Sequence, residues 1–212
     1  MDYTEPNLNK AALITIDVQN DFTLPGAPLE VAGTMERVPA MGKLLAASRT
    51  AGRPIIHIVR LYLTDGSNAD LCRRTAVAAG QRVVAPGSHG AELVDALKPS
   101  PSMRLDAATL LAGKPQSVGP AEWIIYKPRW GAFYQTPLEQ HLRELGVDTL
   151  VFCGCNFPNC PRTSLYEASE RDFRLVLARD AISALYEQGE KELSRIGVRL
   201  WTVHEIAEWF GQ

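Results

Sequence analysis

The hydrophobic positions of the chain fall into short apolar runs separated by longer amphipathic segments. Runs without a helical period predict strands buried on both faces, at residues 11–17, 55–60, 122–127, 149–153, 173–178 and 198–201. Helical patterns follow most of these runs, at residues 35–51, 136–145, 161–171, 183–196 and 203–210. Because strands and helices alternate, we predict an α/β fold with three layers: a doubly wound, mostly parallel six-stranded sheet with helices on both faces.

The segment from residue 61 to residue 119 is less regular than the rest of the chain. Short helical patterns at residues 90–97 and 106–111 are separated by prolines and glycines that interrupt longer elements. We interpret this segment as an excursion from the sheet, so residues 1–212 are predicted to form a single domain.

Composition narrows the class of protein. Hydrophobic residues make up 46% and charged residues 22%, which allows a sizeable core without disulfides or structural metals. The formal net charge of −2 provides no basic face for a phosphate backbone, so no nucleic-acid partner is expected. Residues 1–10 lack a secretory pattern, and no apolar run reaches membrane-spanning length. Three of four cysteines lie within residues 153–160, which favours free thiols in a cytoplasmic protein.

Chemically reactive side chains follow the ends of three predicted strands. Asp17 and Lys127 each end an apolar run, and the turn at residues 154–160 leads into a helix that begins beside Cys160. Ligands of an open parallel sheet bind at the carboxyl ends of its strands, so these groups are expected on one rim. We predict that Cys160 is a nucleophile, with Asp17 as its general base and Lys127 as a stabilising cation.

The residue after Cys160 limits where an oxyanion can be bound. Pro161 suits the first turn of a helix but has no N–H to donate. The donors are therefore expected from the amide of Cys160 or from the turn around Asn156.

Simpler structural roles compete with these assignments. An aspartate at a strand end often forms a local turn or helix cap, which is the alternative for Asp17. Lys127 taken alone is typical of a solvated surface charge, and only its neighbours on the rim favour a catalytic role. Trp130 and Phe133 either line the pocket or close the core.

The remaining cysteines and one histidine have structural interpretations. Cys153 is expected to pack in the core of its strand, whereas Cys155 either supports the nucleophile or is inert. The spacing Cys-x-Cys-x4-Cys lacks the paired pattern of structural zinc sites, so we predict no metal there. His57 lies within an apolar run and is interpreted as a buried, hydrogen-bonded histidine.

Three motifs together resemble a known family. Residues 14–22 (ITIDVQNDF), 127–133 (KPRWGAF) and 154–160 (GCNFPNC) are similar, in this order, to the motifs of the isochorismatase-like cysteine hydrolases. That family includes nicotinamidases, N-carbamoylsarcosine amidohydrolase, ureidoacrylate amidohydrolase and biuret hydrolase. The resemblance implies a catalytic triad of Asp17, Lys127 and Cys160, a thioester intermediate, and a homo-oligomer, either a dimer or a tetramer.

The resemblance also implies details of the pocket. It places a cis peptide bond between Cys155 and Asn156, which would aim the Asn156 amide into an oxyanion hole shared with the Cys160 amide. A cis bond without proline costs about 3–4 kcal/mol, and a trans bond here would count against the interpretation of the site as a whole. Substrate-binding roles are expected for the aromatic residues of the three motifs, which are Phe22, Trp130, Phe133 and Phe157.

The sequence departs from the family in two places. Nicotinamidases carry an aspartate and two histidines as metal ligands after the second strand, whereas residues 60–70 contain no histidine, so we expect no metal and no other cofactor. The segment 156–161 (NFPNCP) also differs from that of many relatives, which leaves the substrate open.

We therefore hypothesise a hydrolase that cleaves a small amide, ureido or carbamoyl C–N bond. Isochorismatases proper lack the cysteine, so by this resemblance the presence of Cys160 favours a C–N bond over a vinyl ether. A vinyl-ether hydrolase is the first alternative. A non-catalytic binding or redox-responsive protein on the same scaffold is the other.

Overall fold

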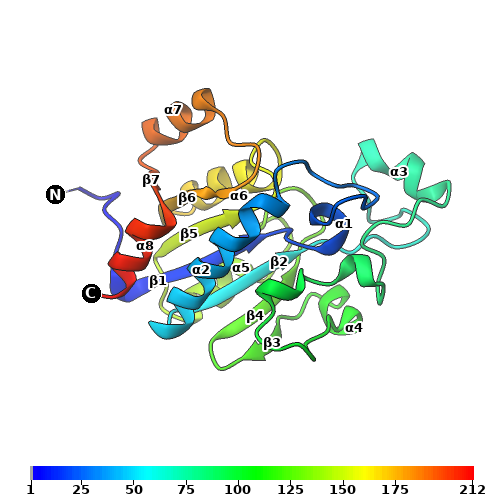
Figure 1. The fold of residues 1–212 in the computed structure, drawn as a ribbon, viewed down its shortest axis with the longest axis horizontal. Coiled ribbons are helices and arrows are strands. Elements are labelled where there is room, and N and C mark those ends of the chain that lie inside the picture. Colours follow the sequence, from blue (N-terminus) through cyan, green and yellow to red (C-terminus); the bar gives the residue numbers. More distant parts are fainter. Residues whose placement is uncertain (1) are drawn as a thin grey trace.

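The computed structural model describes residues 2–212, in which seven strands form one sheet (Figure 1). Their order across the sheet is β3-β4-β2-β1-β5-β6-β7. The strands are β1 (Ala11–Ile16), β2 (Ile55–Val59), β3 (Gln116–Gly119), β4 (Glu122–Tyr126), β5 (Thr149–Gly154), β6 (Arg174–Ile182) and β7 (Arg199–Trp201). All neighbours pair in parallel except β3 with β4.

The predicted fold class is confirmed, with one strand more than the six expected. The additional strand, β3, is antiparallel and lies at the edge of the sheet. Its four residues are polar or small and not fully buried, so no apolar run marked it in the sequence.

Helices cover both faces of the sheet. On one face lie α2 (Val38–Thr50) and α8 (Val203–Phe210), and on the other lie α5 (Leu138–Glu144), α6 (Cys160–Ser169) and α7 (Glu187–Arg195). Three further helices, α1 (Asn20–Thr23), α3 (Leu71–Ala78) and α4 (Ala107–Leu111), belong to the connections; α1 and α3 lie beyond the carboxyl ends of β1 and β2 (Figure 1). Single 3-10 turns are η1 (Leu8–Lys10), η2 (Met35–Arg37), η3 (His89–Ala91) and η4 (Asp95–Leu97). No helix within residues 2–212 combines the length and apolar character needed to cross a membrane.

The continuous apolar runs are explained by burial on both faces. In β1, Ile14 and Ile16 pack with α5 and α6, while Leu13 on the other face packs with α2 and α8. A third cluster of apolar residues lies under the irregular segment, around Leu61, Val83 and Leu110. Because side chains alternate between the faces of a strand, residues of both parities must be apolar.

The irregular segment differs from its prediction in one important element. Helix α3 was not predicted, because it buries only Val77 and its sequence has no apolar period. The expected helix at residues 90–97 is replaced by two 3-10 turns, and the one at 106–111 is confirmed as α4.

The four central strands end in register. Beyond the last residues of β1, β4 and β5, the amides of Asp17, Lys127 and Cys155 donate to the carbonyls of Ile58, Val59 and Ile16 at 2.9, 3.0 and 2.8 Å. Each rim residue is therefore fixed by a hydrogen bond to the neighbouring strand.

A buried polar chain crosses the same strands on the α2 side. His57 is fully buried, with Nδ1 2.8 Å from the Thr15 hydroxyl and Nε2 2.8 Å from Glu122 Oε1. Arg49 donates to both oxygens of Glu122, at 2.9 and 2.7 Å. The interpretation of His57 as a satisfied core residue is confirmed.

The hydrogen bonds from Arg49 and His57 control the ionisation of the Glu122 carboxyl group. Burial by itself would raise the pKa of Glu122, but the bonds from Arg49 and His57 lower it from 4.5 to about 2. A carboxyl whose pKa is lowered by folding stabilises the protein above the unfolded pKa and loses this contribution as pH falls through the folded value.

Glu122→Gln should lower the free energy of unfolding at pH 7 by about 3 kcal/mol, the equivalent of a pKa change from 4.5 to about 2. The difference from wild type should shrink as pH falls from 4.5 towards 2. Urea unfolding followed by circular dichroism measures both effects. The exposed Glu36→Gln is the control and should change the same free energy by less than about 0.5 kcal/mol. A Glu122→Gln protein as stable as wild type at pH 7 would contradict the argument.

Candidate active site

The site is built around a buried ion pair between two strand ends. Lys127 Nζ lies 2.9 Å from Asp17 Oδ2, and both side chains are almost completely excluded from solvent. The ammonium also donates to the carbonyl of Arg129 at 3.2 Å. Burial alone would lower the pKa of Lys127, but the Asp17 carboxylate and Cys160 raise it above its ordinary value. Lys127 is therefore a cation at neutral pH.

The thiol of Cys160 lies close enough to both members of this pair for their charges to shift its pKa, and it lines the same cavity as Asp17. Cys160 begins α6 and is 6% exposed. Burial and the Asp17 carboxylate raise the pKa of its thiol well above the usual range, and Lys127 offsets part of this rise. Cys160 is therefore protonated at rest, with a carboxylate beside it that can accept the proton.

Asp17 has the free oxygen that this proton transfer requires. Its Oδ1 is buried and has no hydrogen-bond partner within residues 2–212, whereas Oδ2 binds Lys127. The residue also has φ 53°, in the left-handed region that aspartate tolerates better than most residues. Such backbone strain in a buried residue is typical of functional sites.

A glycine lets the strand before the cysteine pass close to the Asp17 strand. Gly154 has φ 127°, and a Cβ atom there would lie 2.3 Å from the carbonyl oxygen of Ile16. Only glycine fits both the backbone conformation and the available space. Gly154 thus sets the approach of the turn 155–159 to the ion pair.

The expected cis peptide is wrong for this structure. Between residues 2 and 212 no peptide bond is cis, so Cys155–Asn156 is trans. The trans form has the lower free energy. The N–H groups on either side of Asn156 are both hydrogen-bonded: that of Cys155 donates to Ile16 O and that of Phe157 to Ser183 O. No acceptor within the described residues binds the amides of Asn156 and Cys160, so both are free to donate.

A narrow cavity of about 20 Å³ opens beside the thiol. Two of the four predicted substrate-binding residues, Phe22 and Trp130, line it together with Asn156. The structure places the other two in the core: Phe133 packs against Phe173, and the fully buried Phe157 packs against Tyr186. Their apolar rings are used to attach α6 and its neighbours to the sheet.

Three cavity residues from the end of β2 and from α3 escaped prediction. Arg60, Tyr62 and Arg73 line the cavity, and Arg60 pairs with the buried Asp70 at 2.9 Å. The hydroxyl of Tyr62 also donates to Asp70, at 2.9 Å. The rule that charged residues at strand ends form the rim would have found Arg60, which follows β2. Arg73 had no comparable signal, because α3 has no apolar period.

The residues at the end of β2 do not fit the metal site of nicotinamidases. Oδ2 of Asp70 accepts from both Arg60 and Tyr62, its buried Oδ1 has no partner within residues 2–212, and the guanidinium of Arg73 lines the same cavity. Across residues 2–212, no three His, Cys, Asp or Glu side chains come together as a ligand set. Adjacent cations and paired donors disfavour a divalent ion.

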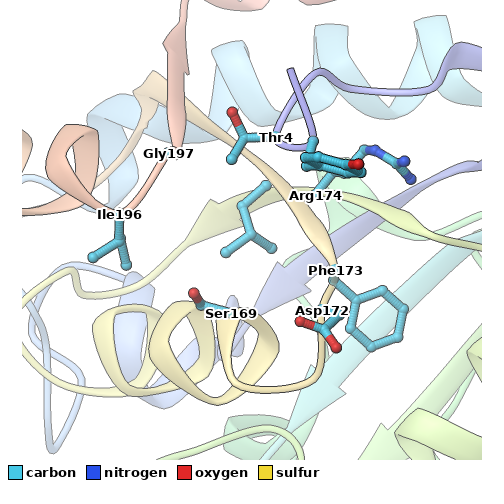
Figure 2. Close-up of a pocket in the computed structure, with 9 residues that line it drawn as sticks. Thr4, Ser169, Asp172, Phe173, Arg174, Ile196 and Gly197 are labelled. Carbon is cyan, nitrogen blue, oxygen red and sulfur yellow. The ribbon is translucent and has the colours of Figure 1, made fainter. Parts of the chain in front are cut away.

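A larger hollow of about 490 Å³ lies at the other end of α6 (Figure 2). Ser169, Asp172 and Ile196 are among the residues that line it, and its lining has no cysteine, histidine or lysine. The ten residues of α6, from Cys160 to Ser169, place its two ends about 14 Å apart. This hollow therefore has no thiol and no lysine or histidine base beside its hydroxyl groups, and it is remote from the ion pair.

The other cysteines are not placed for catalysis. Burial raises the pKa of Cys153 to about 12, and it raises that of Cys155, which accepts a hydrogen bond from Thr34, to about 11. Cys153 packs in the core as expected, and Cys155 lines the cavity. Cys72 on α3 is exposed.

Known proteins resemble this chain along most of its length. The family model described as isochorismatase domain matches residues 11–107 and 107–199. A probable inactive nicotinamidase of Arabidopsis thaliana is 30% identical over 93% of this chain and 94% of that protein. Ureidoacrylate amidohydrolase RutB of Methylobacterium radiotolerans is 31% identical over 86% of this chain and 69% of that protein. The crystal structure of an isochorismatase family protein of Desulfovibrio vulgaris superposes with a TM-score of 0.81 at 32% identity, covering 96% of this chain and 99% of that one.

The charges around Cys160 predict how the pH profile of its alkylation shifts when Asp17 or Lys127 is replaced. Asp17→Asn should move the pH profile of Cys160 alkylation by iodoacetamide to lower pH, since the carboxylate raises the thiol pKa and Lys127 lowers it. Lys127→Met should move the profile to higher pH. Mass spectrometry of the Cys160 peptide measures the rates, in a Cys72→Ser background because Cys72 is exposed. Circular dichroism checks that each variant is folded. The reverse order would contradict this electrostatic description.

Proposed function

We propose, because this chain belongs to the isochorismatase family, that it is a hydrolase of small amide, ureido or carbamoyl compounds that acts through Cys160. Its membership confirms the resemblance seen in the three sequence motifs. Relatives named ureidoacrylate amidohydrolase, maleamate amidohydrolase and N-carbamoylsarcosine amidase support a C–N bond as the target. The observation that carries the proposal is the buried Asp17–Lys127 ion pair, which lies close enough to the Cys160 thiol to shift its pKa and whose aspartate lines the same cavity.

In the first half of the proposed reaction, Cys160 attacks the carbonyl carbon of the substrate. The thiol proton moves to the free Oδ1 of Asp17 as the C–S bond forms, so no bare thiolate has to persist in the buried site. The carbonyl oxygen becomes an oxyanion, for which we propose the free amides of Asn156 and Cys160 as donors. The C–N bond then breaks, Asp17 protonates the leaving nitrogen, and a thioester remains.

In the second half, water cleaves the thioester. Asp17 takes a proton from the attacking water and gives it to the sulfur as the C–S bond breaks, which releases the acid and restores the thiol. Lys127 stays charged throughout and compensates the Asp17 carboxylate whenever that group is ionised. The reaction consumes one water and yields an acid and an amine or ammonia.

Cys160→Ala should abolish this activity, by on the order of 10³-fold or more, because the variant has no nucleophile. A screen of small amides, carbamoyl compounds and ureas for ammonia release provides the assay. Cys72→Ser, which removes an exposed thiol on α3, is the matched control and should keep wild-type turnover. Mass spectrometry of the wild type should detect an acyl group on Cys160. Full activity in a folded Cys160→Ala protein would exclude the thioester mechanism.

The same variants separate the two alternatives. A vinyl-ether hydrolase would keep its turnover after Cys160 is replaced or alkylated, because that reaction needs no thiol. A non-catalytic binding protein would show no turnover in the screen, and Cys160 would be no more reactive than Cys153 and Cys155.

We also propose, from the family resemblance, a single hydrolase domain that assembles as a dimer or tetramer in the cytoplasm. A small-molecule substrate is the partner we propose for the site. Light scattering coupled to size-exclusion chromatography tests the assembly.

A further inference from the structure

Arg73 holds an unusual position at the mouth of the catalytic cavity. It lies in the first turn of α3, and its guanidinium carbon is 5.7 Å from the centre of the Phe22 ring and 5.2 Å from that of Trp130. Its Nη1 donates to the hydroxyl of Tyr62 at 3.2 Å. All four side chains line the cavity that contains Cys160. Arg73 thus bridges Phe22 of α1 and Trp130 of the segment after β4, in the cavity that Cys160 also lines.

The charges that line this cavity do not balance. Asp17 is paired with Lys127, and the buried Asp70 is paired with Arg60. Arg73 is the remaining charged residue, and no carboxylate of residues 2–212 lies within 4 Å of its guanidinium. The catalytic site therefore has one uncompensated positive charge, about where a substrate must enter.

The position of Arg73 also explains why the cavity is small. Its volume of about 20 Å³ holds about one water molecule. Stacking of a guanidinium on aromatic rings is a weak interaction, which an incoming ligand can exchange for a stronger one. A carboxylate supplies one, because it accepts two parallel hydrogen bonds from the planar guanidinium.

We propose that Arg73 anchors the substrate by pairing with a carboxylate that the substrate carries beside its scissile amide. The preferred substrates are then small amide, ureido or carbamoyl compounds with one carboxylate. This assignment rests on the proposed function for the identity of the scissile bond, but not for the binding of an anion. Phe22 and Trp130 hold the guanidinium near the cavity in the absence of substrate.

Two alkylating agents of nearly equal size test the anion preference without a known substrate. Iodoacetate carries a carboxylate where iodoacetamide carries an amide, and both label Cys160. In a Cys72→Ser background, Arg73→Gln should lower the ratio of the iodoacetate rate to the iodoacetamide rate by about tenfold, since a charge a few ångströms away is removed. Arg73→Lys should keep part of the ratio. Arg82→Gln, which removes the same charge from an exposed position, should leave it unchanged.

A binding measurement makes the test independent of thiol reactivity. Calorimetric titration of the Cys160→Ala protein with succinamate and with its neutral counterpart succinamide should show tighter binding of the anion, and Arg73→Gln should remove the difference. If neither measurement distinguishes charged from neutral compounds, the assignment of Arg73 is wrong. Selective alkylation of Cys160 without charge preference would leave the proposed function intact. Anion binding through Arg73 without any turnover in the amide screen would instead reject the proposed function alone.

Discussion

The buried pair of Asp17 and Lys127 is the interaction on which the site depends. Two unit charges that are removed from water are costly unless each compensates the other at close range. Their 2.9 Å separation requires that β1 and β4, which are not neighbours, end at the same level on either side of β2. The hydrogen bonds from the Asp17 and Lys127 amides to β2 maintain that level. The register of the sheet is thus a condition for the chemistry at its edge.

The same constraint recurs elsewhere in the molecule. The buried Asp70 has Arg60, and the buried Glu122 has His57 and Arg49. Ion pairs of this kind contribute little net stability compared with apolar packing, but the loss of one partner is costly because the other remains buried. They therefore fix which loop lies against which strand. Arg73 differs from these groups in having its counter-charge left for a ligand to supply.

The sequence contained most of what specifies the sheet and part of what specifies the site. Parallel strands buried on both faces produce apolar runs, and a polar residue at the end of such a run lies on the rim, which located Asp17, Lys127 and Cys160. Arg73 escaped because α3 is attached through one buried side chain, so its sequence has no periodic signal. Phe133 and Phe157 are aromatic residues of the kind that often line pockets, but here they pack in the core. Whether such a ring faces the pocket or the core depends on the path of its loop, which the sequence pattern does not reveal. The peptide bond before Asn156 was taken from the family and not from local sequence, and the structure has the trans form.

The backbone at Gly154 constrains the side of the site that carries the reactive groups, whereas the residues on the opposite side of the cavity are free to vary. Because no side chain fits between this residue and Ile16, the distance from the thiol to the ion pair is fixed by the backbone of two adjacent strands. On the opposite side the cavity is lined by Arg73 of α3, a helix outside the sheet of whose eight residues Val77 is buried. New substrate ranges can therefore arise on this scaffold by drift in one peripheral helix while the reactive groups stay in place.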